Sequence, residues 1–140
     1  MSTVFITGTN KGIGLELAKQ YLADGHNVIA TCRDRNKEDA LDALARDYKD
    51  RLQICEMDLS NVDSLRALAP KLAGQPIDIF INNAGAAIGY STDSERNVFG
   101  ALDAEIWVNM FRSNAIGPVL LAQYLYPNIL PGKDKKIIFV

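Results

Sequence analysis

The chain of 140 residues has few of the residues that build metal centres and disulfide frameworks. It contains two cysteines, Cys32 and Cys55, and a single histidine, His26, and these residues do not stand at the spacing of metal ligands. No apolar run approaches the ~20 residues that cross a bilayer, and the N-terminus lacks the basic segment and cleavage site of a signal peptide. These absences predict a cytoplasmic protein with reduced thiols, no metal and no membrane partner.

Charge of neither sign is in large excess. Lys and Arg total 15 and Asp and Glu total 17, which gives a formal net charge of −2. Proteins that bind nucleic acid carry a strongly basic surface, so nucleic acid is not an expected partner. The apolar fraction of 48% and the length are sufficient for one hydrophobic core, and no linker or repeat divides the chain. We therefore predict a single domain over residues 1–140.

Short apolar runs alternate with helical patterns along the sequence. The continuous, partly β-branched runs predict strands that are buried on both faces, at 3–7, 27–32, 52–57, 77–82 and the closing KKIIFV. Strands that alternate with helices predict an α/β fold, in which helices cover both faces of a doubly wound parallel sheet. The crossover connections are expected to be right-handed.

The helical patterns have recognisable ends. The first is expected to end near Gly25, the second to be capped by Asn36, and the third to begin near Asn61 and to be kinked or shortened by Pro70. Two further helical patterns lie near 103–111 and 118–126, after a polar loop that is expected from 86 to about 101.

Three glycines follow the first predicted strand, in the segment TGTNKGIG. Gly8 permits a tight turn, Gly12 lets the backbone approach a phosphate, and Gly14 lets the following helix pack closely on the sheet. The helix N-terminus adds free N–H groups and the positive end of the helix dipole. A plain glycine-rich turn does not explain three glycines at one helix start, so the segment predicts a dinucleotide-binding, Rossmann-type domain. The residues expected to bind the cofactor here are Gly8, Asn10, Lys11, Gly12, Ile13 and Gly14.

Two basic residues indicate which dinucleotide is bound. NAD-binding folds place an acidic residue after the second strand, where it meets the ribose hydroxyls, but this sequence has Cys32 and then Arg33. A guanidinium binds a 2′-phosphate that an acid would repel, and Lys11 in the glycine segment adds a second positive charge. Asp34 follows directly and could still reach the ribose, and the two basic residues could instead be solvated loop charges. We predict NADP(H) over NAD(H) as the cofactor.

The glycine segment and INNAG at 81–85 together resemble the short-chain dehydrogenase/reductase family. The two motifs follow the first and fourth predicted strands, and the resemblance extends through Asp58 and SNAIGP at 113–118 over the whole chain. Trp107 and the stretch NAIGPVLLAQYLYP are similar to the carbonyl-reductase and C-factor-like members. The resemblance implies an oxidoreductase that transfers a hydride between NADP(H) and a small-molecule carbonyl or alcohol substrate.

The resemblance also implies cofactor contacts after the third and fourth strands. Asp58 would accept a hydrogen bond from the adenine amino group, with the Leu59 backbone alongside, and Gly85 would let the backbone pass near the nicotinamide ribose. From the residues alone, Asp58 or Ser60 could instead cap the next helix, and the Asn pair at 82–83 could fasten two strands together. The residues expected to bind the cofactor in these two segments are Asp58, Leu59, Asn82, Ala84 and Gly85.

Asn114 is the one member of the family's catalytic tetrad that this chain contains. The resemblance implies that it holds a water linking the catalytic lysine to solvent, although its carboxamide could equally support a helix kink before Gly117 and Pro118. The family's general acid is a tyrosine that is followed four residues later by a lysine, and none of the five tyrosines here has that lysine. We see no replacement acid in the sequence.

The closing KKIIFV adds a last expectation. As the fifth strand of a sheet ordered 3-2-1-4-5, it needs helices on both faces and a neighbour along its open edge. The chain supplies neither after Val140, so we expect exposed apolar surface, a homo-oligomer, and a truncation before the family's Ser, Tyr and Lys that leaves the chain inactive. The alternatives are a complete, non-catalytic NADP(H)-binding sensor or interaction module, and another Rossmann-type protein such as a methyltransferase.

Overall fold

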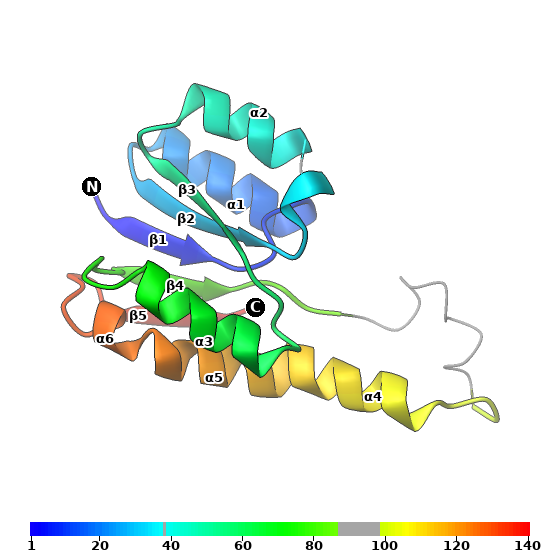
Figure 1. The fold of residues 1–140 in the computed structure, drawn as a ribbon. Helices are drawn as coiled ribbons and strands as arrows, with labels where there is room; N and C mark the ends of the chain where they lie inside the picture. The colour runs from blue at the N-terminus through cyan, green and yellow to red at the C-terminus, as the bar shows by residue number, and fades with distance from the viewer. Residues whose placement is uncertain (38, 87–98) are drawn as a thin grey trace.

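A computed structural model of the chain describes residues 1–37, 39–86 and 99–140. The described residues form one parallel sheet in the order β3-β2-β1-β4-β5 (Figure 1). Its strands are β1 (Thr3–Ile6), β2 (Asn27–Cys32), β3 (Leu52–Glu56), β4 (Ile79–Asn82) and β5 (Lys136–Phe139). Each neighbouring pair of strands runs parallel, so the predicted α/β fold and its strand order are confirmed.

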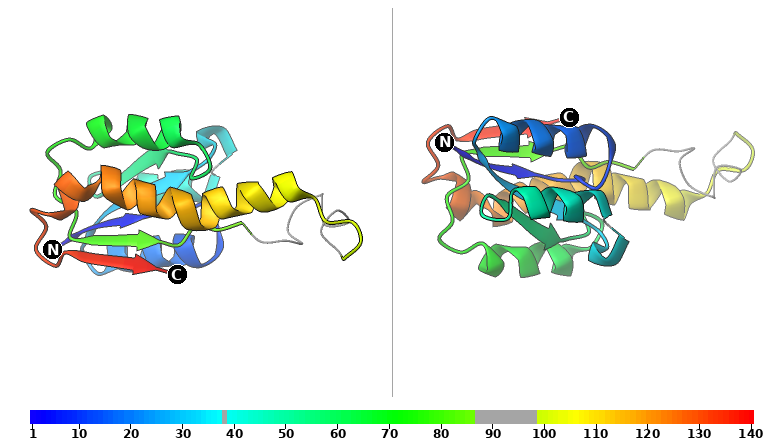
Figure 2. Two further views of the ribbon diagram at one scale, coloured as in Figure 1. Left: turned by 90° about the horizontal axis from the view of Figure 1, so that it is seen from below. Right: turned by 90° about the horizontal axis from the view of Figure 1, so that it is seen from above.

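Helices cover both faces of this sheet (Figure 2). On one face lie α1 (Gly12–Ala23) and α2 (Asp39–Asp47), and on the other lie α3 (Val62–Lys71) and α5 (Gly117–Tyr124). The other helical segments are a 3-10 turn at Arg35–Lys37, α4 (Ala104–Phe111), a π-helical turn at Arg112–Ile116 and α6 (Tyr126–Ile129). None of the helices in the described part of the chain has the length and apolar character that crossing a bilayer requires.

The sheet separates two hydrophobic cores, because alternate residues of each strand point to opposite faces. In β1, Val4 and Ile6 pack in the core beneath α1 and α2, whereas Phe5 packs in the core beneath α3 and α5. Phe5 also stacks on Phe80 of β4, with the ring centroids 5.3 Å apart. Burial on both faces is the physical reason for the continuous apolar runs in the sequence.

The two cysteines lie on neighbouring strands but point to opposite faces of the sheet. Cys55 of β3 pairs in register with Thr31 of β2, so Cys32, the next residue of β2, points the other way. Both side chains are buried, one in each core, and neither is in a disulfide. Burial raises the pKa of the Cys55 thiol above its ordinary value, because the charged thiolate is poorly solvated there.

Some predicted strand ends differ from the structure. β1 ends at Ile6 and β3 at Glu56, each one residue earlier than expected. β4 begins at Ile79 rather than at Ile77, because the Ile77 N–H donates to the Asn128 carbonyl of α6 (2.9 Å) instead of to a strand. Ile77 is nevertheless fully buried, and burial is the property that made it resemble a strand residue.

The helix ends follow the predictions in part. Asn61 caps α3, with its side-chain oxygen accepting from the N–H groups of Asp63 (3.0 Å) and Ser64 (3.2 Å). Pro70 lies in the last turn of α3, which ends one residue later. The prediction that Asn36 caps the second helix is wrong, since Asn36 lies within the 3-10 turn and α2 begins further along. The polar loop expected from 86 to about 101 lies largely outside the described residues.

β5 is an edge strand with exposed apolar side chains. Ile137, Ile138 and Phe139 are all about half exposed, although consecutive residues point to opposite faces. Both faces of this strand are therefore incompletely covered by the described residues, as the sequence predicted.

Candidate functional site

The buried hydroxyl of Thr7 joins the carboxyl ends of β1 and β4. It donates to the Asn82 side-chain oxygen (3.1 Å) and accepts from the backbone N–H groups of Asn83 (3.0 Å) and Ala84 (2.9 Å). These bonds use the one donor and both acceptor positions of a hydroxyl. Thr7 was not among the predicted site residues, although a hydroxyl at the end of an apolar run is a visible signal in the sequence.

The Asn83 carboxamide fixes the glycine segment against β4. Its Nδ2 donates to the carbonyls of Thr7 (3.0 Å) and Gly8 (3.1 Å). Gly8 has a φ of +68°, and a Cβ at this position would lie 2.8 Å from the Ala84 Cα. A Cβ at Gly14 would collide with the Gly8 carbonyl and the Asn83 amide. The two sequence motifs therefore interlock, and the Asn pair does fasten two strands together.

The other side of the glycine segment faces open space. Gly12 has a φ of +58°, and a Cβ there would meet no described protein atom within 4 Å. Lys11, the N-cap residue of α1, makes no side-chain capping bond, whereas Asn61 and Asp103 cap α3 and α4. The first N–H groups of α1 are consequently available to an anion, and the backbone before them can be approached closely.

Thr9 ties the glycine segment to the end of β2. Its N–H and its hydroxyl both donate to the Thr31 carbonyl at 3.0 Å. Arg33 therefore lies on the strand end next to the glycine segment, and both Arg33 and Lys11 are exposed. Asp34 directly precedes the 3-10 turn, and its carboxylate accepts from the Asn36 N–H (3.1 Å). A 2′-phosphate bound at this corner could be contacted by the two positively charged side chains of Lys11 and Arg33.

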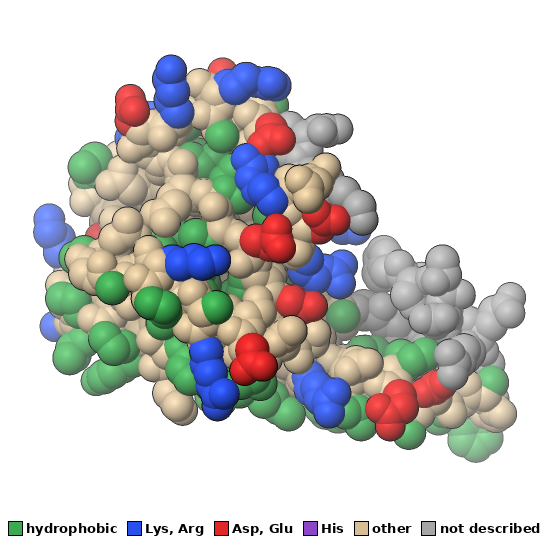
Figure 3. Space-filling model, in the orientation of Figure 1, with side chains coloured by type: hydrophobic (Ala, Val, Ile, Leu, Met, Phe, Trp, Pro, Cys, Tyr) green, Lys and Arg blue, Asp and Glu red, His purple; other side chains and the backbone are tan. Residues whose placement is uncertain are grey.

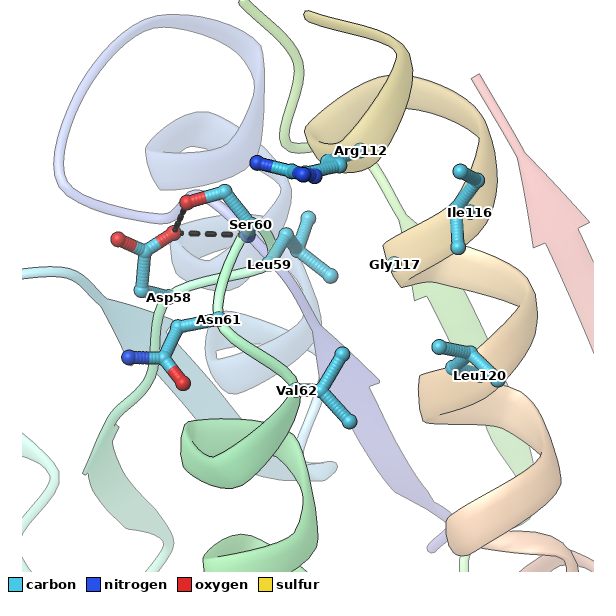
Figure 4. Close-up of a pocket in the computed structure, with 9 residues that line it drawn as sticks. All are labelled: Asp58, Leu59, Ser60, Asn61, Val62, Arg112, Ile116, Gly117 and Leu120. Carbon is cyan, nitrogen blue, oxygen red and sulfur yellow. Dashed lines mark hydrogen bonds between the residues drawn. The ribbon is translucent and has the colours of Figure 1, made fainter. Parts of the chain in front are cut away.

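Asp58 follows β3 and forms a tight turn with Ser60. Its Oδ1 accepts from the Ser60 N–H (2.8 Å) and from the Ser60 hydroxyl (2.7 Å), as Figure 4 shows. Since Asn61 caps α3, the alternative that Asp58 or Ser60 is the cap is wrong. The hydrogen bonds described for this carboxylate all use Oδ1, so Oδ2 has the capacity to accept from a ligand.

Asn114 lies in the π-helical turn and binds the segment after β4. Its Oδ1 accepts from the Ala86 N–H (2.7 Å), and its Nδ2 donates to the Ala86 carbonyl (2.6 Å). A Cβ at Gly85 would make only an ordinary contact, 3.6 Å from this Oδ1, so no described protein atom excludes a side chain there. The carboxamide thus bonds the backbone of the neighbouring segment with both its oxygen and its nitrogen.

The π-helical turn has two local causes. Pro118 has no N–H, so the carbonyl four residues earlier, that of Asn114, loses its usual helical donor. The Ser113 hydroxyl donates to the carbonyls of Asn109 (3.0 Å) and Met110 (3.2 Å). The helices predicted near 103–111 and 118–126 are therefore joined through this turn, and α5 begins at Gly117. π-Helical turns of this kind are frequent at functional sites.

The loops after β1 to β4 and the π-helical turn bring the predicted residues to one edge of the sheet. These residues are Gly8, Asn10, Lys11, Gly12, Ile13, Gly14, Arg33, Asp58, Leu59, Asn82, Ala84, Gly85 and Asn114. In open parallel sheets ligands bind at this carboxyl edge, where the strand order reverses, here between β1 and β4. Within residues 1–37, 39–86 and 99–140, no group of three or more His, Cys, Asp or Glu is placed to hold a metal ion.

A sheet in this order, with a glycine turn at the switch point and a helix directly after it, defines the Rossmann-type class of α/β proteins. Within that class the chain belongs to the short chain dehydrogenase family, whose model matches residues 2–140. It is 33% identical to the uncharacterized oxidoreductase YKL071W of Saccharomyces cerevisiae, over 99% of this chain and 54% of that protein. It is 28% identical to the NADP-dependent 3-hydroxy acid dehydrogenase YdfG of Escherichia coli, over 96% of this chain and 52% of that protein. The chain spans about half the length of the curated relatives that it matches.

Solved structures give the same relationship. A carbonyl reductase from Pseudomonas aeruginosa PAO1 in complex with NADP superimposes with a TM-score of 0.80 and 34% identity, over 91% of this chain and 56% of that one. Serine dehydrogenase from Escherichia coli superimposes with a TM-score of 0.75 and 28% identity, over 98% of this chain and 60% of that one. The shared part contains the glycine segment and the β4 end described above.

The Thr7 hydroxyl gives a direct test of the junction between β1 and β4. Thr7→Val keeps the side-chain shape but leaves the partly buried N–H groups of Asn83 and Ala84 without their acceptor, so we expect a loss of about 2–3 kcal/mol in the free energy of unfolding. Thr7→Ser keeps the hydroxyl and loses one methyl group, and it is expected to cost about 1 kcal/mol. Urea unfolding followed by circular dichroism measures both variants. Equal stabilities for the Val and Ser variants would contradict the role of the hydroxyl.

Proposed function

We propose that these 140 residues are the cofactor-binding portion of an NADP(H)-dependent oxidoreductase of the short-chain dehydrogenase type. The reaction is hydride transfer between NADP(H) and a small-molecule carbonyl or alcohol. The observation that carries the proposal is the open side of the glycine segment, where a Cβ at Gly12 would meet no described protein atom within 4 Å and the N-cap residue of α1 makes no side-chain capping bond. A pyrophosphate satisfies both the free donors and the dipole of such a helix start.

The preference for NADP(H) rests on the residues around the adenosine ribose. Cys32 stands where NAD-binding folds have an acidic residue, and the exposed Arg33 follows it on the strand end next to Lys11. The names of several relatives also specify NADP, among them YdfG and the P. aeruginosa carbonyl reductase complex. A doubly negative 2′-phosphate is favoured by two cations and would be disfavoured by an acid in place of Cys32.

Proton supply is the step for which the chain lacks the family's residues. When bound, NADPH supplies the hydride that adds to a carbonyl carbon, and the carbonyl oxygen must then gain a proton. No tyrosine in the chain is followed four residues later by lysine, so no pair is present to give that proton in the family's manner. Loss of a general acid typically costs ~10²–10⁴ in rate. The 140 residues alone are therefore expected to bind the cofactor without turning over a substrate.

Asn114 is proposed to act through its main-chain carbonyl rather than through its side chain. The carboxamide is bonded at both ends to Ala86, and Pro118 has no N–H to occupy the Asn114 carbonyl. A carbonyl that lacks its usual helical donor has capacity to accept from a water. The side chain meanwhile positions the segment that follows Gly85.

A second candidate function is a non-catalytic NADP(H)-binding sensor or interaction module. The lack of a Tyr-x-x-x-Lys pair in the 140 residues is the observation that favours it. An intact-mass measurement of the natural protein distinguishes the candidates. A longer chain with a serine, a tyrosine and a lysine beyond residue 140 supports the oxidoreductase, and a mass that matches 140 residues supports the sensor. A cytoplasmic location stays a prediction for either.

An apolar stripe on the helical segment from α4 to α6 leads us to propose a homo-oligomer. Trp107, Phe111, Ile116, Val119 and Tyr126 are 40–60% exposed, and no residue of α4 is buried. α4 extends beyond the end of the sheet in Figure 1, and hydrophobic side chains run along the lower edge of the molecule in Figure 3. The five side chains carry no charge, so two copies of the stripe can pack against each other across a two-fold axis without repulsion.

Phe111→Glu tests this interface, because it places a negative charge in the stripe of each copy. The two like charges would repel each other across the two-fold axis. We expect the variant to sediment as a monomer in analytical ultracentrifugation, while the unaltered chain sediments as a dimer. Ala43→Glu, at an exposed position of α2 on the other face of the sheet, is the matched control and should stay dimeric. An unaltered chain that is monomeric at micromolar concentration would rule out the proposed interface.

The cofactor preference is tested by titrating NADPH and NADH into the chain and following nicotinamide fluorescence. We expect tighter binding of NADPH, and a loss of about 10- to 100-fold in its affinity in Arg33→Ala, since a charge-assisted hydrogen bond contributes about 1.5–3 kcal/mol. The affinity for NADH should change little. Arg46→Ala on the exposed side of α2 is the control for loss of one positive charge. Equal affinities of the unaltered chain for the two nucleotides would count against the preference.

A further inference from the structure

A cleft of about 570 Å³ lies between the β3–α3 connection and the π-helical turn (Figure 4). One wall consists of residues 58–62, and the other consists of Arg112, Ile116, Gly117 and Leu120. The volume falls within the range of small-ligand sites. Because Asp58 and Leu59 belong to both this cleft and the candidate cofactor site, a ligand group bound by these two residues would also face the second wall.

The charged side chains of the cleft stand on opposite walls. Asp58 uses Oδ1 for its bonds to Ser60, at 2.8 and 2.7 Å, which leaves Oδ2 to accept from a ligand. Arg112 extends from the π-helical turn toward the Ser60 side of the cleft in Figure 4. Among the described residues, its guanidinium makes one long hydrogen bond, from Nη1 to the Asn109 side-chain oxygen at 3.3 Å. A guanidinium donates hydrogen bonds in its own plane, so this bond leaves the flat face of the group available for stacking.

The two charges restrict the chemistry of the ligand group. An anion would be attracted by Arg112 and repelled by Asp58, and a cation would experience the opposite. A neutral aromatic ring with an amino group suits both walls, because the amino group donates to the carboxylate and the ring face attracts the guanidinium. Ile116 and Leu120 add apolar surface beside such a ring. Adenine is a ring of this type, and NADP(H) carries it.

The backbone brings Arg112 to this position. A Cβ at Gly117 would collide with the Leu59 carbonyl, so the close approach of the π-helical turn to the Asp58–Ser60 segment requires glycine. The Gly117 N–H donates to the Arg112 carbonyl across the π-helical turn. The distance between the two walls is therefore fixed by direct backbone contact one turn away from the arginine.

We propose that the guanidinium of Arg112 stacks on the adenine ring of NADP(H), on the opposite side of the cleft from Asp58. The inference rests on the proposed function and adds to it a cofactor-binding residue from the π-helical turn. Arg112 and Asn114 both lie in the π-helical turn. Binding of both ends of the dinucleotide therefore depends on the geometry of this turn.

Arg112→Ala tests this role with four ligands, measured by isothermal titration calorimetry on the 140-residue chain. NADPH, NADH and adenosine 2′,5′-bisphosphate contain adenine, and reduced nicotinamide mononucleotide does not. We expect the variant to bind each adenine-containing ligand roughly 3- to 30-fold more weakly, by the same factor for all three, as expected for loss of a cation–π contact. Binding of the mononucleotide should not change.

The controls separate stacking from other causes. Arg66→Ala removes an exposed arginine of α3 that does not line the cleft, and it should leave all four affinities unchanged. Circular dichroism should show the same fold and melting temperature for Arg112→Ala, since this side chain is exposed. An unchanged affinity, or a loss confined to the two ligands with a 2′-phosphate, would overturn the stacking. An unaltered chain that binds none of the four ligands would overturn the proposed function and this inference with it.

Discussion

The junction between the ends of β1 and β4 is the constraint on which the rest of the site depends. Thr7 contributes a buried hydroxyl with three partners, and Asn83 contributes a carboxamide that holds the carbonyls of Thr7 and Gly8. The glycine segment reaches this junction only because Gly8 and Gly14 have no Cβ. The N-cap residue of α1, which follows this segment, makes no side-chain capping bond, so the first N–H groups of the helix can donate to a phosphate.

A second junction extends the site along the sheet edge to the helical segment. Asn114 binds the backbone of Ala86, and Gly117 lies against the Leu59 carbonyl, so the π-helical turn contacts the segments after both β4 and β3. One irregular turn thereby sets the positions of both Arg112 and Asn114. Turns of this kind are frequent at functional sites.

Local sequence signals were sufficient for the elements that depend on burial or on backbone freedom. Strands buried on both faces are continuous apolar runs, and Gly8 and Gly12 adopt positive φ, so the fold, the strand order and the tight turn of the glycine segment were all predictable. Three contacts were not predictable, because each joins residues that are distant in the sequence. They are the bonds of the Thr7 hydroxyl, the Ala86–Asn114 contact and the contact of Gly117 with Leu59. Ile77 was placed in a strand for its burial, although its N–H is bonded to α6. Family resemblance indicated Asn114 but not the engagement of its carboxamide.

The most direct test of the account is to map NADP⁺ binding onto the backbone by ¹H–¹⁵N NMR titration of the 140-residue chain. The account predicts saturable chemical-shift changes in the amides of Gly12 and Ile13 at the start of α1, and in those of Arg33, Leu59 and Gly85 at the neighbouring strand ends. The helix α2 contributes no residue to the candidate site, so the chemical shifts of its amides should not change. An absence of saturable changes at the glycine segment, or changes confined to α2, would contradict the claim that the β1–β4 junction builds a dinucleotide site.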